Sequence, residues 1–149
     1  MKFSSRLAIA VHSLLAIEFY SERQKVTADF LASSTGVNPV IIRNVLAQLK
    51  AVGLVEIMPG VGGTKLKKSI DEISLLDVFQ AVETEENLFH LHEKPNPDCQ
   101  IGKNIHRVLN EELKKIQDAV KNKMKKITLR KMFENSLQNQ SSETNPSSS

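Results

Sequence analysis

The spacing of apolar residues predicts three helices in the first third of the chain. The run Leu7–Ile17 predicts a first, largely buried helix that begins near Ser4 or Ser5. Thr27 opens a second, short helix, because its hydroxyl can cap the amino end. That helix ends by Gly36, since glycine readily adopts the left-handed conformation that stops a helix and reverses the chain.

A third helix begins soon after this turn. Asn38 is a good N-cap, and Pro39 suits the first helical position, where its missing amide hydrogen is not needed. One face carries apolar residues at helical spacing and is expected to be buried; these residues are Ile41, Ile42, Val45, Leu46, Leu49 and Val52. The opposite face carries Asn38, Val40, Arg43, Asn44, Ala47 and Lys50.

The outer face of this third helix offers side chains that read base edges and phosphates in a DNA major groove. The candidate contacts from the two short helices are Thr27, Asn38, Pro39, Val40, Arg43 and Asn44. Arg43 and Asn44 can hydrogen-bond bases or phosphates, while Asn38 and Pro39 set how the helix enters the groove. An ordinary solvated helix face is the alternative, because such motifs also arise by chance.

A glycine-tipped hairpin after the third helix favours DNA binding. Gly53 ends the helix, Leu54–Met58 is a strand candidate, residues 59–63 form a turn, and Thr64–Lys68 alternates polar with apolar. Glycines let the backbone approach a phosphate closely, and lysines add sequence-independent attraction. The residues expected to do so are Gly60, Gly62, Gly63 and Lys65, with Lys67 and Lys68 beside them. The sequence therefore predicts a winged helix-turn-helix domain.

Charge is distributed unevenly along the 149 residues, although the net charge is only +3. Residues 1–68 hold nine basic residues (Lys or Arg) and four acidic ones (Asp or Glu). Residues 69–100 hold one basic and eight acidic residues, and residues 101–131 hold ten basic and three acidic residues. An acidic block between two basic ones predicts a DNA-facing half and a separate middle surface. The single cysteine suits a reducing compartment, so we expect a cytoplasmic protein with no membrane span.

A long amphipathic helix is predicted from Ile101 to Ile127. Its apolar stripe consists of Ile101, Ile105, Val108, Leu109, Leu113, Ile116, Val120, Met124 and Ile127. Such a helix runs about 40 Å, too long for so small a domain to cover the stripe. We expect the same helix of a second subunit to cover it, which gives a homodimer with two reading heads. The alternative is a helix folded back on its own wing domain.

Four segments of the chain occur in a characteristic order: Met1–Ala10, Leu46–Val55, Gly60–Gly63 and Glu72–Glu83. Together they resemble the Rrf2 family of bacterial winged helix-turn-helix transcription regulators, and the likeness extends to about Leu129. The resemblance implies a dimer that binds double-stranded DNA, and a repressor rather than an activator. It also suggests DNA contacts from the amino terminus, at Lys2, Ser4, Ser5 and Arg6.

The segment Thr84–Gln100 is predicted to be a loop where a regulator would sense a signal. In cluster-binding members of the family this loop supplies three cysteines to an iron–sulfur centre. Here only Cys99 remains, and a cluster needs several thiolates, so no iron–sulfur cluster and no other cofactor is expected.

Cys99 itself has three interpretations. The first is a small half-buried residue at the start of the long helix. The second is a redox switch, in which the helix amino end and Lys103 favour the thiolate that oxidants attack. The third is a metal site with His90 and His92, although their spacing fits no standard pattern.

The expected organisation has four parts. They are a mainly α winged helix-turn-helix domain with a small β wing at 1–83, a sensor loop at 84–100, the dimerisation helix and a short closing helix (Thr128–Phe133) at 101–134, and a disordered tail at 135–149. The chain has no nucleophile elbow, phosphate loop or recognisable carboxylate pair, so it is not expected to be an enzyme. A winged-helix module that binds only protein partners is the remaining alternative.

Overall fold

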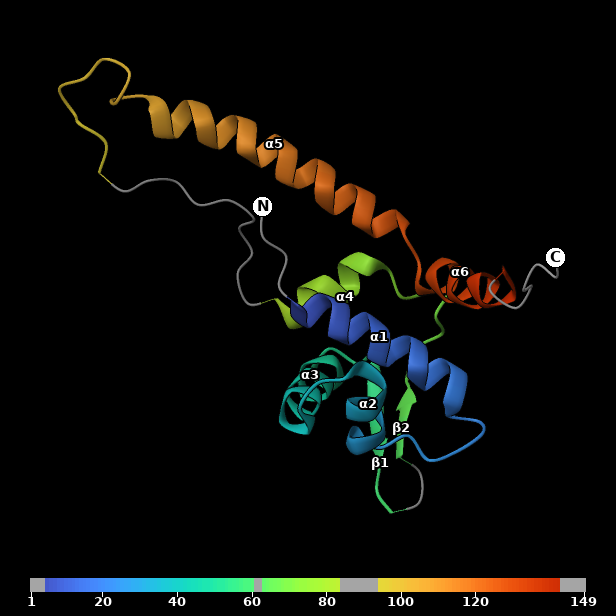
Figure 1. Cartoon of the computed structure of the whole chain (residues 1–149). Helices are drawn as coiled ribbons and strands as arrows, with labels where there is room; N and C mark the ends of the chain where they lie inside the picture. The colour runs from blue at the N-terminus through green and yellow to red at the C-terminus, as the bar shows by residue number, and fades with distance from the viewer. Residues whose placement is uncertain (1–4, 61–62, 84–93, 143–149) are drawn as a thin grey trace, which may run out of the picture.

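The computed structural model describes residues 5–60, 63–83 and 94–142, with side chains to residue 138. Within these residues the chain forms six helices and one two-stranded sheet (Figure 1). In chain order they are α1 (Ser5–Tyr20), α2 (Ala28–Thr35), α3 (Pro39–Ala51), β1 (Val55–Met58), β2 (Gly63–Leu66), α4 (Leu75–Val82), α5 (Ile105–Lys126) and α6 (Leu129–Ser142). The predicted mainly α fold with a small β wing is confirmed.

The predicted helix caps form as expected. The Thr27 hydroxyl accepts a hydrogen bond from the Phe30 amide at 3.0 Å, and the Asn38 side chain accepts one from the Val40 amide at 2.8 Å. Between these two helices, Gly36 adopts the left-handed conformation with φ of 74°. These local bonds satisfy amides that a helix start leaves unpaired, so α2, the turn and α3 follow from short sequence signals.

The buried stripe of α3 is narrower than predicted. Ile42, Val45, Leu46 and Leu49 are buried, but Ile41 is 39% exposed and Val52 is 50% exposed. The four buried residues occupy a sector of about 100° on the helix, and Ile41 and Val52 lie just outside one edge of this sector. Val52 follows the last helical residue. The prediction that these two side chains are buried is therefore wrong.

Helix α1 is the element around which the domain is built. It contacts α2 and α3 as well as α4, α6 and β2, and Figure 1 shows it crossing between them. Leu14 and Ile17 of α1 are fully buried in the same core cluster as Ile42 and Leu49 of α3. The predicted first helix thus supports the helix-turn-helix pair from behind.

The wing is an antiparallel hairpin that is attached near its turn to the loop before α2. Val55 pairs with Leu66 and Met58 with Gly63. The Thr64 amide donates a hydrogen bond to the Val26 carbonyl at 2.8 Å, and the Lys25 ammonium group donates one to the Gly60 carbonyl. These bonds hold the hairpin against the body of the domain.

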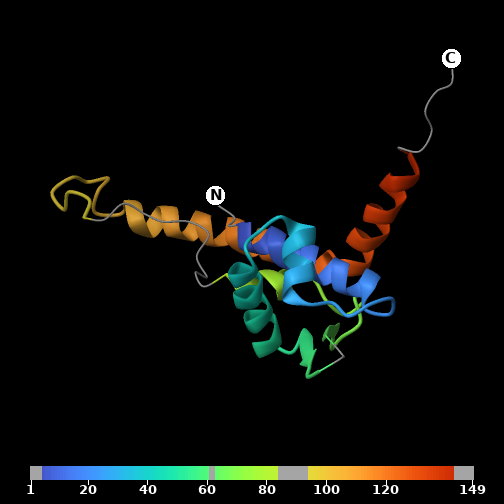
Figure 2. The same ribbon diagram turned by 60° about the horizontal axis from the view of Figure 1, so that its bottom comes forward.

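Helix α5 begins later than predicted and projects away from the domain (Figures 1 and 2). Residues 101–104 form turns, so the helix starts at Ile105 and runs about 33 Å. Gly102 lies so close to Asn96 that an added Cβ would be 2.3 Å from its carbonyl oxygen. The chain before α5 is therefore folded tightly on itself and does not extend the helix.

Helix α6 is longer than the predicted closing helix, because it reaches Ser142. The expectation of a disordered tail from Asn135 is wrong for residues 135–142, and residues 143–149 lie outside the described part. Met132 and Phe133 pack against the core, and Leu137 continues their spacing by one helical turn. This apolar spacing was the missed signal.

The arm formed by α5 and α6 is joined to the domain by backbone and side-chain bonds. The Leu75 amide donates to the Ile127 carbonyl at 2.8 Å, and the Leu129 amide donates to the Ile73 carbonyl at 2.9 Å. The Arg130 guanidinium donates two hydrogen bonds to the Asp71 carboxylate, at 3.0 and 3.1 Å. The arm therefore enters the domain beside the start of α4.

Two wing glycines allow a matched test of the hairpin. Gly60 and Gly63 both have positive φ, but an added Cβ at Gly60 meets nothing within 4 Å, whereas one at Gly63 lies 2.8 Å from the Val26 carbonyl oxygen. Gly60→Ala should lower the free energy of unfolding by about 1 kcal/mol through backbone strain. Gly63→Ala should lower it clearly more. Urea unfolding followed by circular dichroism measures both, and equal losses would contradict the clash.

The Asp71–Arg130 pair predicts a pH dependence of stability. The Arg130 hydrogen bond lowers the pKa of Asp71 below its usual 3.8. The stabilisation of the folded state by the Asp71–Arg130 pair is therefore fully present above the unfolded pKa of 3.8, and it is lost as the pH falls through the lowered pKa of the folded state. Asp71→Asn should be less stable than wild type at about pH 7, and the difference should shrink below about pH 4. Unfolding titrations at both pH values measure this; a difference that does not change with pH would refute it.

Candidate nucleic-acid interface

The exposed face of α3 is the surface best placed for a DNA groove. Asn38, Arg43 and Asn44 are exposed, and Val40 is 58% exposed although it is apolar. The opposite face of the helix is held in the core. A helix fixed on one side with charged, amide and aliphatic groups on the other has the chemistry that contacts base edges and phosphates.

Arg43 has a carboxylate neighbour within this surface. Its guanidinium lies 3.6 Å from the Asp29 carboxylate of α2, and both side chains are mostly exposed. Exposed ion pairs of this kind contribute little to stability. Arg43 therefore keeps an acidic neighbour on the very face that would meet an anionic ligand, and sequence spacing alone did not show it.

Arg6 of α1 contacts a side chain of α3. It is half-buried, and its guanidinium donates a hydrogen bond to the Gln48 side chain of α3. This bond connects α1 to the back of α3. Arg6, a sequence candidate for DNA contact, is thus hydrogen-bonded within the protein to a side chain of α3.

The wing candidates separate into exposed and buried groups. Gly60 is exposed at the turn with φ of 76°, and Lys67 and Lys68 are exposed beyond β2. Lys65 is half-buried, and Gly63 is buried against the Val26 backbone. The expectation that Gly63 lies open at the tip is therefore wrong, because its missing side chain makes room for the protein's own backbone.

Several candidate residues fall outside the described part of the chain. Gly62, Lys2 and Ser4 are among them, and so are His90 and His92. Ser5 is exposed at the first residue of α1, and Thr27 is half-buried with its hydroxyl used as a helix cap.

One cation was missed by sequence reasoning. Lys25 is exposed beside the wing and bonds the Gly60 carbonyl, although 35 positions separate the two residues. The sequence shows only that Lys25 is a basic residue shortly before α2. Its position beside the wing depends on the path of the chain between α1 and α2.

Cys99 lies in the turn that precedes α5. It is exposed, its amide donates to the Asn96 carbonyl at 3.3 Å, and its carbonyl accepts from the Lys103 amide at 3.0 Å. The prediction of a half-buried residue at the start of the long helix is wrong, because that helix begins at Ile105. The assumed benefit of the helix amino end to the thiolate loses its geometric support for the same reason.

No group of three His, Cys, Asp or Glu side chains in the described residues is arranged to hold a metal ion. In the same part of the chain, every helix is too short or too polar to cross a lipid bilayer.

The fold and the exposed α3 face define a winged helix-turn-helix transcription regulator, which is a DNA-binding class and not an enzyme. The chain belongs to the Rrf2 family, whose model is described as "Iron-dependent Transcriptional regulator" and matches residues 3–135. The family predicted from the sequence is therefore confirmed.

Relatives support the same class. The "Putative HTH-type transcriptional regulator YwnA" of Bacillus subtilis (strain 168) is 40% identical over 121 residues, which are 81% of this chain and 89% of that protein. A solved structure described as "a putative DNA binding protein" has a TM-score of 0.67 at 34% identity and covers 85% of this chain and 97% of its own. The solved structure of CymR, "the Global Cysteine Regulator of B. subtilis", has a TM-score of 0.66 at 19% identity. The match covers 90% of this chain and 97% of CymR, and it supports the fold alone.

The family description raises the question of an iron centre. An iron–sulfur cluster is held mainly by cysteine thiolates, and this chain has one cysteine. That cysteine lies exposed in a turn whose nearest bonded neighbours are backbone groups of Asn96 and Lys103. The donor set does not fit a cluster, so no step of the function below depends on iron.

Proposed function

We propose that this protein is a homodimeric repressor that binds a palindromic operator in double-stranded DNA. The observation that carries the proposal is the exposed α3 face, where Val40, Arg43 and Asn44 stand out from a helix whose other side is buried. Such a helix can enter a major groove without disturbing the core. A DNA-binding regulator acts where the DNA is, which fits the cytoplasm of a bacterium.

In this proposal each recognition helix enters one half-site. Arg43 and Asn44 contact bases or phosphates, with Asn38 and Pro39 at the end of the helix that enters the groove first. The wing lies along the neighbouring backbone or minor groove, where Gly60 and Lys65 approach phosphates and Lys25, Lys67 and Lys68 add positive charge. The amino-terminal residues Lys2, Ser4 and Ser5 supply further contacts.

Exposure of the α5 stripe supports the dimer. Within α5, Val108 is 47% exposed, Leu109 is 36% and Ile116 is 49%, and Ile101 in the turn before the helix is 70% exposed. Ile105, Leu113 and Val120 on the same stripe are only half-buried. An extended apolar surface of this kind marks an interface with another molecule, and a two-fold partner would cover it with the same surface. Two recognition helices on one face would then match a palindrome.

Oxidation of Cys99 is the proposed signal. The thiol is exposed, so oxidants have access to it, and it lies at the junction between the loop and the α5 arm. A change at this junction can reach the reading heads through the arm that joins the two subunits.

DNA binding is tested by fluorescence anisotropy with a labelled fragment of the promoter, at several salt concentrations. Affinity should fall steeply as salt rises, because phosphate contacts release counterions. A protein that binds neither promoter nor random DNA at low salt would favour a module for protein partners instead.

Arg43→Ala should weaken operator binding by about 1–3 kcal/mol if Arg43 reads a base, with a much smaller effect on random DNA. Lys67→Ala is the matched control, because an exposed wing lysine should weaken both kinds of DNA about equally. Anisotropy titrations of wild type and both variants on the two DNAs measure the affinities. Equal losses on both DNAs for Arg43→Ala would make it a phosphate contact.

Cys99→Ser should bind the operator as wild type does under reducing conditions and should keep that affinity after peroxide treatment. The wild-type affinity should change on the same treatment and return when a thiol reductant is added. The two proteins are compared by anisotropy before and after oxidation. An unchanged wild-type affinity would remove Cys99 as the sensor and would leave the DNA-binding proposal intact.

A further inference from the structure

An ion pair links the two helices of the helix-turn-helix on their exposed side. The Arg43 guanidinium of α3 lies 3.6 Å from the Asp29 carboxylate of α2, and the two side chains are 60% and 77% exposed. Asp29 is the acidic residue in the first turn of α2. Because Arg43 extends from the exposed face of α3, the Asp29 carboxylate lies on the same surface that would meet DNA.

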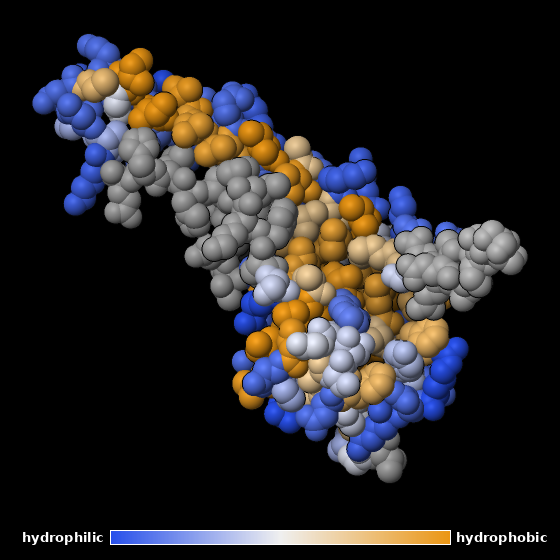
Figure 3. All heavy atoms as spheres, viewed as in Figure 1, coloured by the Kyte–Doolittle hydropathy of each residue, from blue (hydrophilic) through white to orange (hydrophobic). Residues whose placement is uncertain are grey.

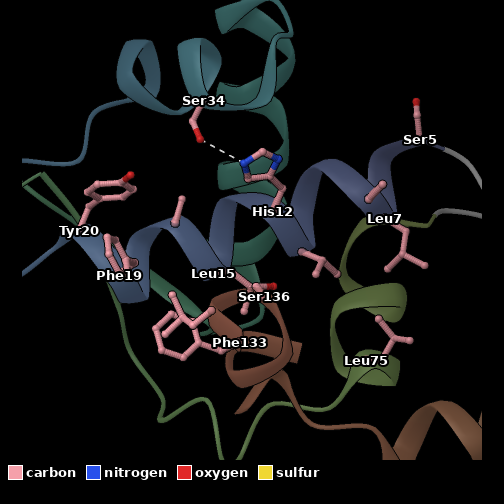
Figure 4. Close-up of a pocket in the computed structure, with 14 residues that line it drawn as sticks. Ser5, Leu7, His12, Leu15, Phe19, Tyr20, Ser34, Leu75, Phe133 and Ser136 are labelled. Atoms are coloured by element: carbon pink, nitrogen blue, oxygen red, sulfur yellow. Dashed lines mark hydrogen bonds between the residues drawn. The ribbon is translucent and has the colours of Figure 1, made fainter. Parts of the chain in front are cut away.

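The fold fixes the backbone positions from which these two side chains extend. Helices α2 and α3 pack on each other and on α1, and Leu31 of α2 and Ile42 of α3 are fully buried. A hydrogen bond of 3.0 Å between His12 of α1 and Ser34 of α2, at the edge of a pocket along α1, also joins α2 to the body of the domain (Figure 4). The closeness of Asp29 to Arg43 is therefore a consequence of how the helices pack.

The pair belongs to the hydrophilic end of the domain. Figure 3 shows hydrophilic surface around the lower end, where Figure 1 places α2 and α3, and hydrophobic surface mainly along the α5 arm and over α1. Exposed cations of α3 and of the segment after the wing, including Lys50, Lys67 and Lys68, attract phosphates. Asp29 opposes this attraction, so it lowers the affinity of the surface for any DNA.

Phosphates and base edges make different demands on Arg43. A phosphate that binds the guanidinium is an anion, and it would be repelled by the Asp29 carboxylate close by. A guanine edge instead offers the neutral acceptors N7 and O6 to two hydrogen bonds. The planar guanidinium has five N–H donors, so it can face a guanine with one edge and keep a carboxylate beside another. Asp29 therefore penalises phosphate contacts of Arg43 more than base contacts.

We propose that Asp29 is a specificity-determining residue, which disfavours contacts between Arg43 and phosphate and keeps the guanidinium for the edge of a guanine. This inference rests on the proposed DNA binding and names the base that Arg43 reads. Asp29 acts through Arg43 and is a positioning residue. Its cost is affinity for all DNA, and its benefit is a larger ratio of operator affinity to random-DNA affinity, which decides where a regulator is bound among many competing sites.

Asp29→Asn removes the charge and keeps the size of the side chain. The affinity for random DNA should rise about threefold or more, whereas the affinity for an operator selected from random oligonucleotides should change less than about twofold. Glu72→Gln is the matched control, because it removes the same charge at an exposed position before α4. It should change both affinities less than about twofold. Anisotropy titrations at low salt measure the affinities, and circular dichroism verifies that each variant folds.

Three results would overturn this inference. An equal rise on both DNAs would make Asp29 a general repulsive charge. Unchanged affinities would leave it only the ordinary role of a carboxylate that stabilises the start of its own helix. Wild-type protein that binds neither DNA would overturn the proposed function as well, so the failures of the two proposals are distinguishable.

A second set of variants tests whether Asp29 acts through Arg43. In the Arg43→Ala background, Asp29→Asn should change both affinities by the same factor, because no guanidinium remains to be directed. A ratio that still falls in this background would mean that Asp29 acts on DNA by itself, contrary to the proposal. Asp29→Glu keeps the charge and should keep the low random-DNA affinity of wild type; behaviour like that of Asp29→Asn would show that charge is not the cause.

The base itself is tested with operator DNA in which 7-deazaguanine, which lacks the N7 acceptor, replaces one guanine at a time. At one guanine of each half-site the replacement should weaken wild-type binding about fivefold or more and leave the binding of Arg43→Ala unchanged. If no guanine behaves in this way, Arg43 does not read guanine and the proposal is wrong.

Discussion

Burial of α3 against α1 is the interaction on which the rest of the structure depends. Ile42 and Leu49 of α3 share a core with Leu14 and Ile17 of α1, and all four are fully buried. Each such side chain contributes about 1.5–3 kcal/mol when it leaves water. Because one face of α3 is held in this way, its other face can carry polar groups into a nucleic-acid groove. The hydrogen bond from Arg6 of α1 to Gln48 of α3 adds a directional polar interaction to this packing of α3 on α1.

Electrostatics on the reading face is mixed, although the face is suited to an anion. Arg43 lies beside Asp29, whose carboxylate also favours the positive amino end of α2. Any phosphate that approaches Arg43 meets this carboxylate too. The Asp29 carboxylate thus offsets part of the positive charge of Arg43, whereas Lys67 and Lys68 of the wing are exposed.

The arm formed by α5 and α6 is attached firmly to the domain at one end and exposes apolar side chains along α5. Backbone bonds between the segments 73–75 and 127–129, together with the Asp71–Arg130 pair, hold one end of the arm against the domain. Beyond that end, α5 presents apolar side chains that no part of the described chain covers. The position of the arm is thus set within one chain, whereas most of its stripe stays uncovered by the described residues.

Local signals in the sequence determined where α2 and α3 start and how the chain reverses between them. Capping by Thr27 and Asn38 and the left-handed conformation of Gly36 each act within one helical turn. Exposure of Ile41 was not predictable, since it depends on the angle at which α3 packs. The start of α5 was decided by the tertiary packing of the turn around Gly102. Tertiary packing also brought Arg43 beside Asp29 and Lys25 beside Gly60, although these residues are distant in sequence. Periodicity shows which side chains share a helix face, but only the packing of whole elements decides which face is buried and which charges meet.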